Sequence, residues 1–277
     1  MSEKYSRKTL KIVQLYPDEM NIYGDNGNVL VLSERSKLYG FSPEISYFEV
    51  GSDPKIIREA DILVGGGGQD SGQLKVAADL QKNAEVFRES IAKGCAGVLI
   101  CGMYQLFGKR FLTNDGDEIA GISVFDVETI AQPKRLIGNI VIDSDFGKLV
   151  GFENHSGLTY LRDGQAAFGE IVSGGGNNGK DGSWNREKED LKNISKVSEK
   201  NLGGSEGSRT ENCFGSYLHG PILSKNPKFA DALLLMAAKR KFGCEQLEAV
   251  NEDSRKRLAH LDEIAERARE IVFSRPR

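Results

Sequence analysis

The chain has 277 residues, and its 37 Lys and Arg residues against 40 Asp and Glu residues give a formal net charge of −3. A charge so close to neutral gives no electrostatic reason to bind nucleic acid or an anionic membrane surface. The sequence contains no run of about 18 consecutive apolar residues, so we expect no membrane-spanning segment. Glycine is over-represented: it accounts for 32 of the 277 residues, about 12%, against a usual share of ~7%.

The cysteines and histidines show no metal-binding pattern. No Cys-x-x-Cys pair occurs among Cys95, Cys101, Cys213 and Cys244, and no histidine lies at short ligand spacing from them. We therefore predict neither a metal site nor a disulfide framework. The N-terminus lacks the apolar stretch of a signal peptide, so we expect the reducing cytoplasm, where thiols stay free for chemistry.

The first half of the chain alternates predicted strands with predicted helices. The strands are 9–15, 45–50, 61–64 and 98–100, and the helices are 29–39, 76–93 and 103–107. This alternation is typical of βαβ units, in which helices cover a parallel sheet. We therefore predict an α/β fold with a mostly parallel, helix-covered sheet.

The alternation of predicted strands and helices stops after residue 119. Short strands are predicted at 121–129, 135–142 and 151–155, and helices at 226–241 and 245–273. The short strands indicate an antiparallel excursion from the parallel sheet. Residues 174–209 are rich in Gly, Asn, Ser, Lys and Glu and almost bare of apolar residues, which predicts a mobile polar surface insertion. We divide the chain into a domain at 1–241, which carries this insertion, and a C-terminal helical extension at 242–277.

Cys101 is the strongest candidate for a nucleophile. It follows the apolar strand 98–100 and precedes Gly102 and a predicted helix. A nucleophile at such a strand-to-helix turn projects at the carboxyl end of the strand, where open α/β sheets place their sites. The helix N-terminus would also lower the thiol pKa and point N–H groups at an oxyanion. The alternative is a buried structural cysteine, which we expect for Cys95.

A thiol nucleophile needs a base, and His219 is the best candidate. It stands at the end of a short apolar strand, immediately before a Gly-Pro turn. A single histidine is more often structural or solvated, and His155 competes for the same role. His260 lies in a charge-rich helix and is expected to face solvent.

The tetraglycine 65–68 also follows a strand. It lacks the Lys-Ser/Thr of a phosphate-binding P-loop and the spacing of a dinucleotide fingerprint. Phosphate cradling, a simple turn and an oxyanion hole all remain open, the last because backbone without a Cβ can approach a reacting carbonyl closely.

Together these segments resemble the class I (triad-type) glutamine amidotransferases of the cobyric acid synthase-like branch. Within it, the chain is most similar to the GatD-type subunits of lipid II isoglutaminyl synthases. The similar segments are 17–28, 65–70, 151–155, 175–179 and 218–221. The resemblance covers about residues 9–240 and implies a flavodoxin-like fold.

The resemblance implies a role for each candidate residue. Cys101 would attack the side-chain amide of glutamine, and His219 would relay protons. Backbone at Gly67 and Gly68, with the N–H of Gly102, would stabilise the oxyanion. Arg135 stands where the family holds the glutamine carboxylate, a task that suits a guanidinium group.

The resemblance also implies a partner. Ammonia would pass to a MurT-type, Mur-ligase-like synthetase, which amidates the α-carboxyl of D-glutamate in the peptidoglycan precursor. No ATP site is legible in the sequence, so no cofactor is expected in this subunit, and ATP and Mg are expected on the partner ligase.

Two positions depart from the family pattern. Met103 replaces the second glycine of Cys-Gly-Gly-Tyr-Gln, and a long side chain there would narrow the glutamine pocket. Pro221 stands where the family usually has the Glu of its triad. We therefore expect either a Cys-His dyad or an acidic residue from the partner.

Two competing functions remain open, of which the two departures motivate the second. One is an amidotransferase subunit that serves a corrinoid a,c-diamide synthase-like ligase. The other is a catalytically silent scaffold that only binds a synthetase.

Overall fold

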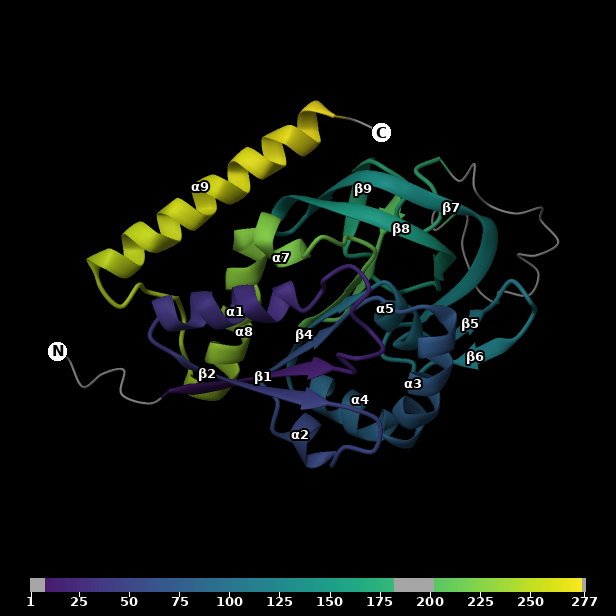
Figure 1. Ribbon diagram of the computed structural model, residues 1–277, viewed down its shortest axis with the longest axis horizontal. Coiled ribbons are helices and arrows are strands. Elements are labelled where there is room, and N and C mark those ends of the chain that lie inside the picture. Colours follow the sequence, from purple (N-terminus) through teal and green to yellow (C-terminus); the bar gives the residue numbers. More distant parts are fainter. Residues whose placement is uncertain (1–7, 182–201, 276–277) are drawn as a thin grey trace.

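The computed structural model describes residues 8–181 and 202–275 and contains two six-stranded sheets with flanking helices (Figure 1). The strands are β1 (Thr9–Leu15), β2 (Ser42–Phe48), β3 (Ile62–Gly65), β4 (Ala96–Ile100), β5 (Arg110–Leu112), β6 (Glu118–Ala120), β7 (Val127–Ser144), β8 (Gly147–Leu161), β9 (Gly169–Ser173), β10 (Ser205–Glu206), β11 (Ser208–Arg209) and β12 (Cys213–Ser216). The helices are α1 (Gly27–Leu38), α2 (Lys55–Arg58), α3 (Asp70–Lys82), α4 (Ala84–Ala92), α5 (Gly102–Leu106), α7 (Ile222–Lys225), α8 (Pro227–Phe242) and α9 (Glu252–Ser274).

The first sheet confirms the predicted parallel α/β core. Its strand order is β11-β12-β4-β3-β1-β2, and every neighbouring pair is parallel except β11 with β12. Strands β3 and β4 are buried along their whole length, as expected for a sheet covered on both faces. Helices α1 and α8 pack together over β1–β4, and α4 packs on β2 through Phe87 and Phe48.

The second sheet is built on one long hairpin rather than on three short strands. Strands β7 and β8 have 18 and 15 residues and pair antiparallel around a turn at Gly147, whose φ is +83°. The predicted strands 121–129 and 135–142 overlap a single strand, because β7 continues through an irregularity. The register with β8 shifts between Ala131 and Leu136, where Pro133 has no N–H for the ladder.

The described ends of the predicted insertion, 174–181 and 202–209, contain buried residues. Asn177, Asn178 and Glu206 have no exposed surface. The carboxylate of Glu153 accepts hydrogen bonds from the backbone N–H groups of Gly175 and Gly176 at 2.8 Å each. Residues 182–201 lie outside the described residues, and the mobility of the insertion stays a prediction.

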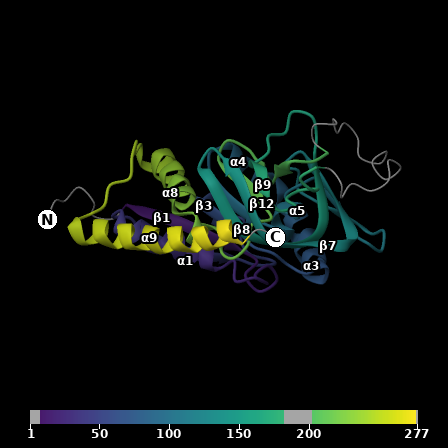
Figure 2. The ribbon, with the colours of Figure 1, turned by 90° about the horizontal axis from the view of Figure 1, so that it is seen from above.

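The C-terminal helix α9 lies along the body of the molecule (Figure 2). It packs against α1, α7 and β7. Buried Arg35 on α1 forms ion pairs with Asp231 of α8 at 2.6 Å and with Asp262 of α9 at 2.7 Å. The predicted extension is therefore held to the first domain. In the part of the chain that the structure describes, no helix has the length and apolar character required to cross a membrane.

Candidate active site

Cys101 occupies a strained turn between β4 and α5. Its φ of +53° and ψ of −108° are rare for a residue with a Cβ, and such strain is typical of functional positions. Its N–H donates to the carbonyl of Ser216 at 2.8 Å, and the side chain is largely buried. The turn therefore fixes the thiol at the carboxyl end of the parallel sheet.

His219 reaches the same edge of the sheet from a distant part of the sequence. It follows β12, which pairs in parallel with β4 so that Ser216 lies opposite Ile100. Parallel neighbours end at the same edge, so the two segments that leave these strands meet there. A Cβ built on Gly67 would lie 2.9 Å from His219 Cε1 and 3.5 Å from Cys101 Cβ. Only a glycine fits at this point between the thiol and the imidazole.

Asp25 supplies the acidic partner that the sequence interpretation did not find. It lies in the loop between β1 and α1, is 2% exposed, and both of its carboxylate oxygens are 3.4 Å from His219 Nδ1. The expectation of a dyad or of an acid from the partner therefore does not describe this geometry. The two residues are 194 positions apart, so their spacing in the sequence does not indicate that they pair. Asp25 does lie in the segment 17–28, which resembles the family.

The environment of His219 favours its protonated form. Burial lowers the pKa of His219, but the negative charges of Cys101 and Asp25 outweigh burial and raise this pKa to about 10. Tyr23 packs edge-on against the ring, with centroids 4.5 Å apart. His219 Nε2 is buried and has no hydrogen-bond partner among the described residues. With Nδ1 held by Asp25, Nε2 is the nitrogen left to exchange a proton with a ligand.

The glycines beside Cys101 differ in what their N–H groups can do. The N–H of Gly67 donates to Asp25 Oδ2 at 2.8 Å, so it is already used in this conformation. Gly102 is the first residue of α5, and its N–H has no acceptor within the helix. A Cβ built on Gly102 would lie 3.0 Å from the nitrogen of Gly68. The Gly68 and Gly102 backbones therefore approach each other next to the thiol.

Met103 does not narrow the pocket, contrary to the sequence expectation. Its side chain is fully buried and lies against Gly65, where a Cβ would collide with it. The helix α5 turns Met103 towards the hydrophobic core, away from the opening at Cys101. Met103, which departs from the family motif, is therefore accommodated in the hydrophobic core and leaves the pocket open.

A pocket of about 520 Å³ opens over Cys101, between the two sheets. Its lining residues are Ile22, Tyr23, Gly67, Gly68, Gln69, Gln73, Cys101, Gln105, Phe111, Arg135, Asn154, His155 and Ser156. Arg135 stands at the rim, within the irregular part of β7 between Ala131 and Leu136. Its Nε donates to Asn154 Oδ1 at 2.8 Å and its Nη2 to the Asn154 carbonyl at 2.9 Å. The guanidinium is thus oriented by β8 while its side chain stays exposed.

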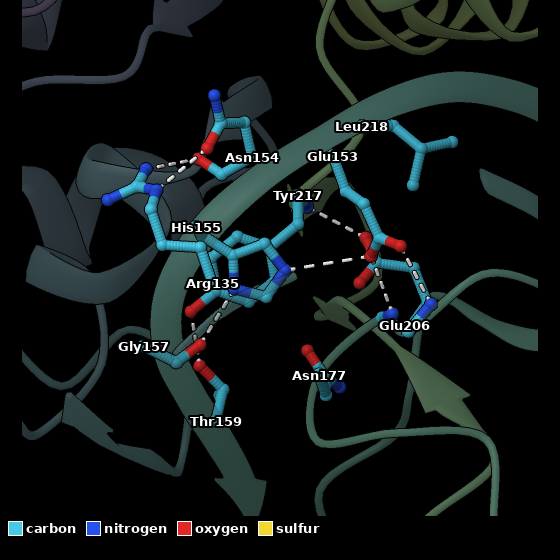
Figure 3. A network of polar contacts seen from close by, with 12 residues as sticks. Arg135, Glu153, Asn154, His155, Gly157, Thr159, Asn177, Glu206, Tyr217 and Leu218 are labelled. Atoms are coloured by element: carbon cyan, nitrogen blue, oxygen red, sulfur yellow. Dashed lines mark hydrogen bonds and ion pairs between the residues drawn. The ribbon is translucent and has the colours of Figure 1, made fainter. Parts of the chain in front are cut away.

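His155 lines the pocket too, but its surroundings differ from those of His219. Its ring stacks on Tyr217 with centroids 3.6 Å apart, and its Nδ1 bonds to the carbonyl of Gly157 at 2.8 Å (Figure 3). Burial lowers the pKa of His155, and the nearby Glu153 offsets this only in part. A neutral, stacked ring forms a wall of the pocket more readily than it serves as a base.

A buried polar network lies behind that wall (Figure 3). Glu206 Oε1 accepts hydrogen bonds from Ser216 Oγ and from the N–H of Tyr217, both at 2.7 Å. Burial raises the pKa of Glu206 to about 7, although these hydrogen bonds act in the opposite direction. Asn177 bonds to Gly207 in both directions, through its side-chain oxygen and nitrogen. These contacts fix the segment that leads into His219.

The other cysteines and the third histidine lie outside the site. Cys95 is fully buried, and burial raises its pKa to about 12, which agrees with a structural role. Cys213 is buried in β12, and Cys244 is partly exposed near the end of α8. His260 is exposed on α9.

The comparisons with known proteins agree on one family. The CobB/CobQ-like glutamine amidotransferase domain matches residues 11–227. The chain is 37% identical over 234 residues to the lipid II isoglutaminyl synthase (glutamine-hydrolyzing) subunit GatD of Staphylococcus aureus (strain N315), covering 84% of this chain and 86% of that protein. The subunit GatD of Streptococcus pneumoniae (strain ATCC BAA-255 / R6) is 36% identical over 237 residues, with coverages of 84% and 82%.

A more distant relative is the probable cobyric acid synthase of Methanocaldococcus jannaschii. It is 25% identical over 221 residues, which are 75% of this chain and 40% of that protein. The family match covers both the segment that carries Cys101 and the segment that carries His219. The chain belongs to the CobB/CobQ-like glutamine amidotransferase family.

Proposed function

We propose that this chain is the glutaminase subunit of a lipid II isoglutaminyl synthase. The observation that carries the proposal is that Cys101 lines one pocket with Arg135 and lies across Gly67 from His219, which faces Asp25. The identity of 37% and 36% to two GatD subunits, over most of each chain, supports this particular amidotransferase.

The geometry supports a thioester mechanism. The raised pKa of His219 places the Cys101 proton on His219 Nε2, and the resulting Cys101 thiolate attacks the side-chain carbonyl carbon of glutamine. The N–H groups of Gly68 and Gly102 stabilise the oxyanion that forms. The imidazolium then protonates the leaving nitrogen, ammonia departs, and a γ-glutamyl thioester remains on Cys101. Water, deprotonated by His219, hydrolyses the thioester and releases glutamate.

Asp25 and Arg135 have supporting roles in this mechanism. The Asp25 carboxylate orients His219 through Nδ1 and stabilises the imidazolium, as the acid of a catalytic triad does. Its second contact, to the N–H of Gly67, ties the glycine loop to the same carboxylate. The Arg135 guanidinium binds the α-carboxylate of glutamine at the rim, which leaves the side chain to extend towards Cys101.

The product ammonia would be used by a second subunit. The proposed partner is a MurT-type, Mur-ligase-like synthetase that binds ATP and Mg and amidates the D-glutamate α-carboxyl of the peptidoglycan precursor. The proposed location is the cytoplasm, where four free cysteines and a reactive thiol are stable.

A corrinoid a,c-diamide synthase-like ligase is the second candidate for the partner, favoured by the 25% identity to a probable cobyric acid synthase. That match covers less than half of the relative and has lower identity than either GatD match. The alternative of a catalytically silent scaffold rested on Met103 and on the missing triad acid. Neither supports it now, because Met103 packs away from the pocket and Asp25 faces His219.

The test is to co-express this chain with a Mur-ligase-like synthetase and to assay amidation of lipid II. We expect co-purification and amidation that depends on glutamine. Cys101→Ala should abolish the glutamine-dependent reaction while added ammonia still supports amidation, and Cys244→Ala should behave as wild type. Glutamine-dependent amidation that survives Cys101→Ala would refute the nucleophile, and an absence of any complex would refute the partner.

A further inference from the structure

Gln73 places a buried amide beside the reacting centre. It lies in the first turns of α3, is 2% exposed, and lines the same pocket as Cys101. A Cβ on Gly102 would collide with its Nε2, so the amide packs directly on the backbone next to the nucleophile. Neither the family motifs nor the proposed triad accounts for this residue.

A chain of hydrogen bonds uses the Nε2 end of the Gln73 amide. Gln73 Nε2 donates to Gln105 Oε1 at 2.9 Å, and Gln105 Nε2 donates to the hydroxyl of Tyr217 at 3.1 Å. The Tyr217 hydroxyl is itself bonded to Thr159 Oγ1 at 2.6 Å. In this arrangement the Gln73 Nε2 is used within the protein, and Oε1 is the end of the amide that remains for a ligand.

The same chain leaves one atom of Gln73 unsatisfied. Its Oε1 is buried and has no hydrogen-bond partner within residues 8–181 and 202–275. A buried acceptor without a donor destabilises the fold, and binding sites retain such atoms when the ligand supplies the donor. The missing partner is therefore a group with an N–H or O–H that enters the pocket.

We propose that Gln73 Oε1 accepts a hydrogen bond from the side-chain carboxamide N–H of glutamine and thereby selects glutamine over glutamate. The proposal rests on the proposed glutaminase function. The carboxamide is the part of the substrate that must lie next to Gly102 and Cys101, where the Gln73 amide is packed. The α-ammonium group belongs to the Arg135 end of the pocket.

This contact explains a selectivity that the other residues do not supply. Glutamate carries a carboxylate in place of the carboxamide, and a carboxylate offers only acceptor atoms. An oxygen facing Gln73 Oε1 would meet another acceptor, so glutamate binds weakly both as a competitor and as the released product. Sites that hydrogen-bond a substrate N–H reject analogues that lack it much more strongly than apolar pockets do.

The test compares two substrates in one variant of the full chain, in complex with its synthetase. L-Glutamine carries the side-chain N–H, and L-glutamate γ-methyl ester does not. For Gln73→Met we expect kcat/KM for glutamine to fall on the order of 10- to 50-fold, while kcat/KM for the ester changes less than about threefold. Inhibition by glutamate should become tighter. Gln81→Met, at the exposed end of the same helix, is the matched control and should leave both values unchanged.

The ratio of the two kcat/KM values does not depend on how much of the variant folds, so partial misfolding leaves the test valid. An equal loss for both substrates would place Gln73 on the α-ammonium or in a structural role and overturn the proposal. No change for either substrate would overturn it too. If the wild-type complex hydrolyses neither substrate, or if Cys101→Ala still hydrolyses them, the proposed function itself fails.

Discussion

Two buried histidines lie at the pocket, His155 in its lining and His219 behind Gly67, and the two have opposite properties. His219 faces Asp25 and Cys101, and its pKa is raised to about 10. His155 stacks on Tyr217 and bonds to a backbone carbonyl, and its pKa is lowered. Their exposed fractions are 1% and 2%, so burial does not separate them.

The difference shows that the neighbours of a histidine decide its role. At His219 two negative groups outweigh the cost of burying a charge, and Nε2 is left to move a proton. At His155 the acid that raises the pKa is Glu153, whose carboxylate also accepts hydrogen bonds from two backbone N–H groups. One side of the pocket is therefore suited to chemistry and the other to holding the substrate in place.

The largest expected effect comes from exchanging the two histidines for glutamine, one at a time. His219→Gln should lower kcat for glutamine hydrolysis on the order of 10⁴-fold or more, because the proton relay is lost. His155→Gln is the matched control and should lower kcat no more than about tenfold, since it removes the stacking on Tyr217 and the hydrogen bond to Gly157 but no proton relay. Steady-state kinetics of both variants decide the matter, and a greater loss in His155→Gln would reverse the assignment of the two sides.

The second-largest effect on kcat should come from Asp25, the carboxylate that faces His219. Asp25→Asn should lower kcat on the order of 10²- to 10⁴-fold, because the amide neither stabilises the imidazolium nor holds its tautomer. The measurement is kcat in the assembled complex, where any acid from the partner is present. Full activity of Asp25→Asn in the complex would show that the partner supplies the acid and that Asp25 has only a structural role.

The third effect lies on the binding side. Arg135→Ala should raise KM for glutamine on the order of 10- to 100-fold and leave kcat nearly unchanged, because the contact is made equally in the ground state and the transition state. Lys134→Ala, at the adjacent exposed position, is the control. A fall in kcat with KM unchanged would move Arg135 from the binding side to the chemical side.

The smallest effect is on stability, where the two histidines should act with opposite sign. Protonated His219 stabilises the fold fully below about pH 6.5, and this contribution declines as pH rises towards 10. His155 stays neutral in the folded protein, so the fold loses stability as pH falls below about 6.5 and the unfolded chain takes up the proton.

Urea unfolding from pH 5 to pH 10 measures this difference. The stability advantage of wild type over His219→Gln should shrink with rising pH, with a slope of up to about 1.4 kcal/mol per pH unit. His155→Gln should lack the loss on the acid side. If the difference in unfolding free energy between wild type and His219→Gln grew with pH, it would contradict the raised pKa of His219.

The sequence predicted β1, β3 and β4 well, because each is a short, mostly apolar run with a clear boundary, whereas β2 (Ser42–Phe48) is largely exposed and was predicted at 45–50. The predicted strand 9–15 is β1 as observed, and the turn that carries Cys101 lies at the end of β4. Helix 76–93 was less well predicted, since α3 ends and α4 begins on either side of Asn83. The Asn83 side chain bonds back to the carbonyl of Asp79, a local interaction that competes with helix continuation.

The site was predicted where chemistry marks a strand end, and missed where only the tertiary fold brings residues together. Cys101 and His219 follow strands, and their positions alone suggested a function. Asp25 and Gln73 reach the pocket from a loop and a helix face, so no local pattern distinguishes them from solvated polar residues. The direction of Met103 was likewise set by how α5 packs, which a motif does not contain.

The backbone at Cys101 has a consequence for anyone who engineers this chain. A positive φ at a residue with a Cβ costs on the order of 1–3 kcal/mol. Alanine and serine retain that cost, whereas glycine relieves it, so Cys101→Gly should give an inactive protein that melts at a higher temperature than wild type. Selection for thermal tolerance alone would therefore push this turn towards inactive sequences, and a screen for robust variants must also select for turnover.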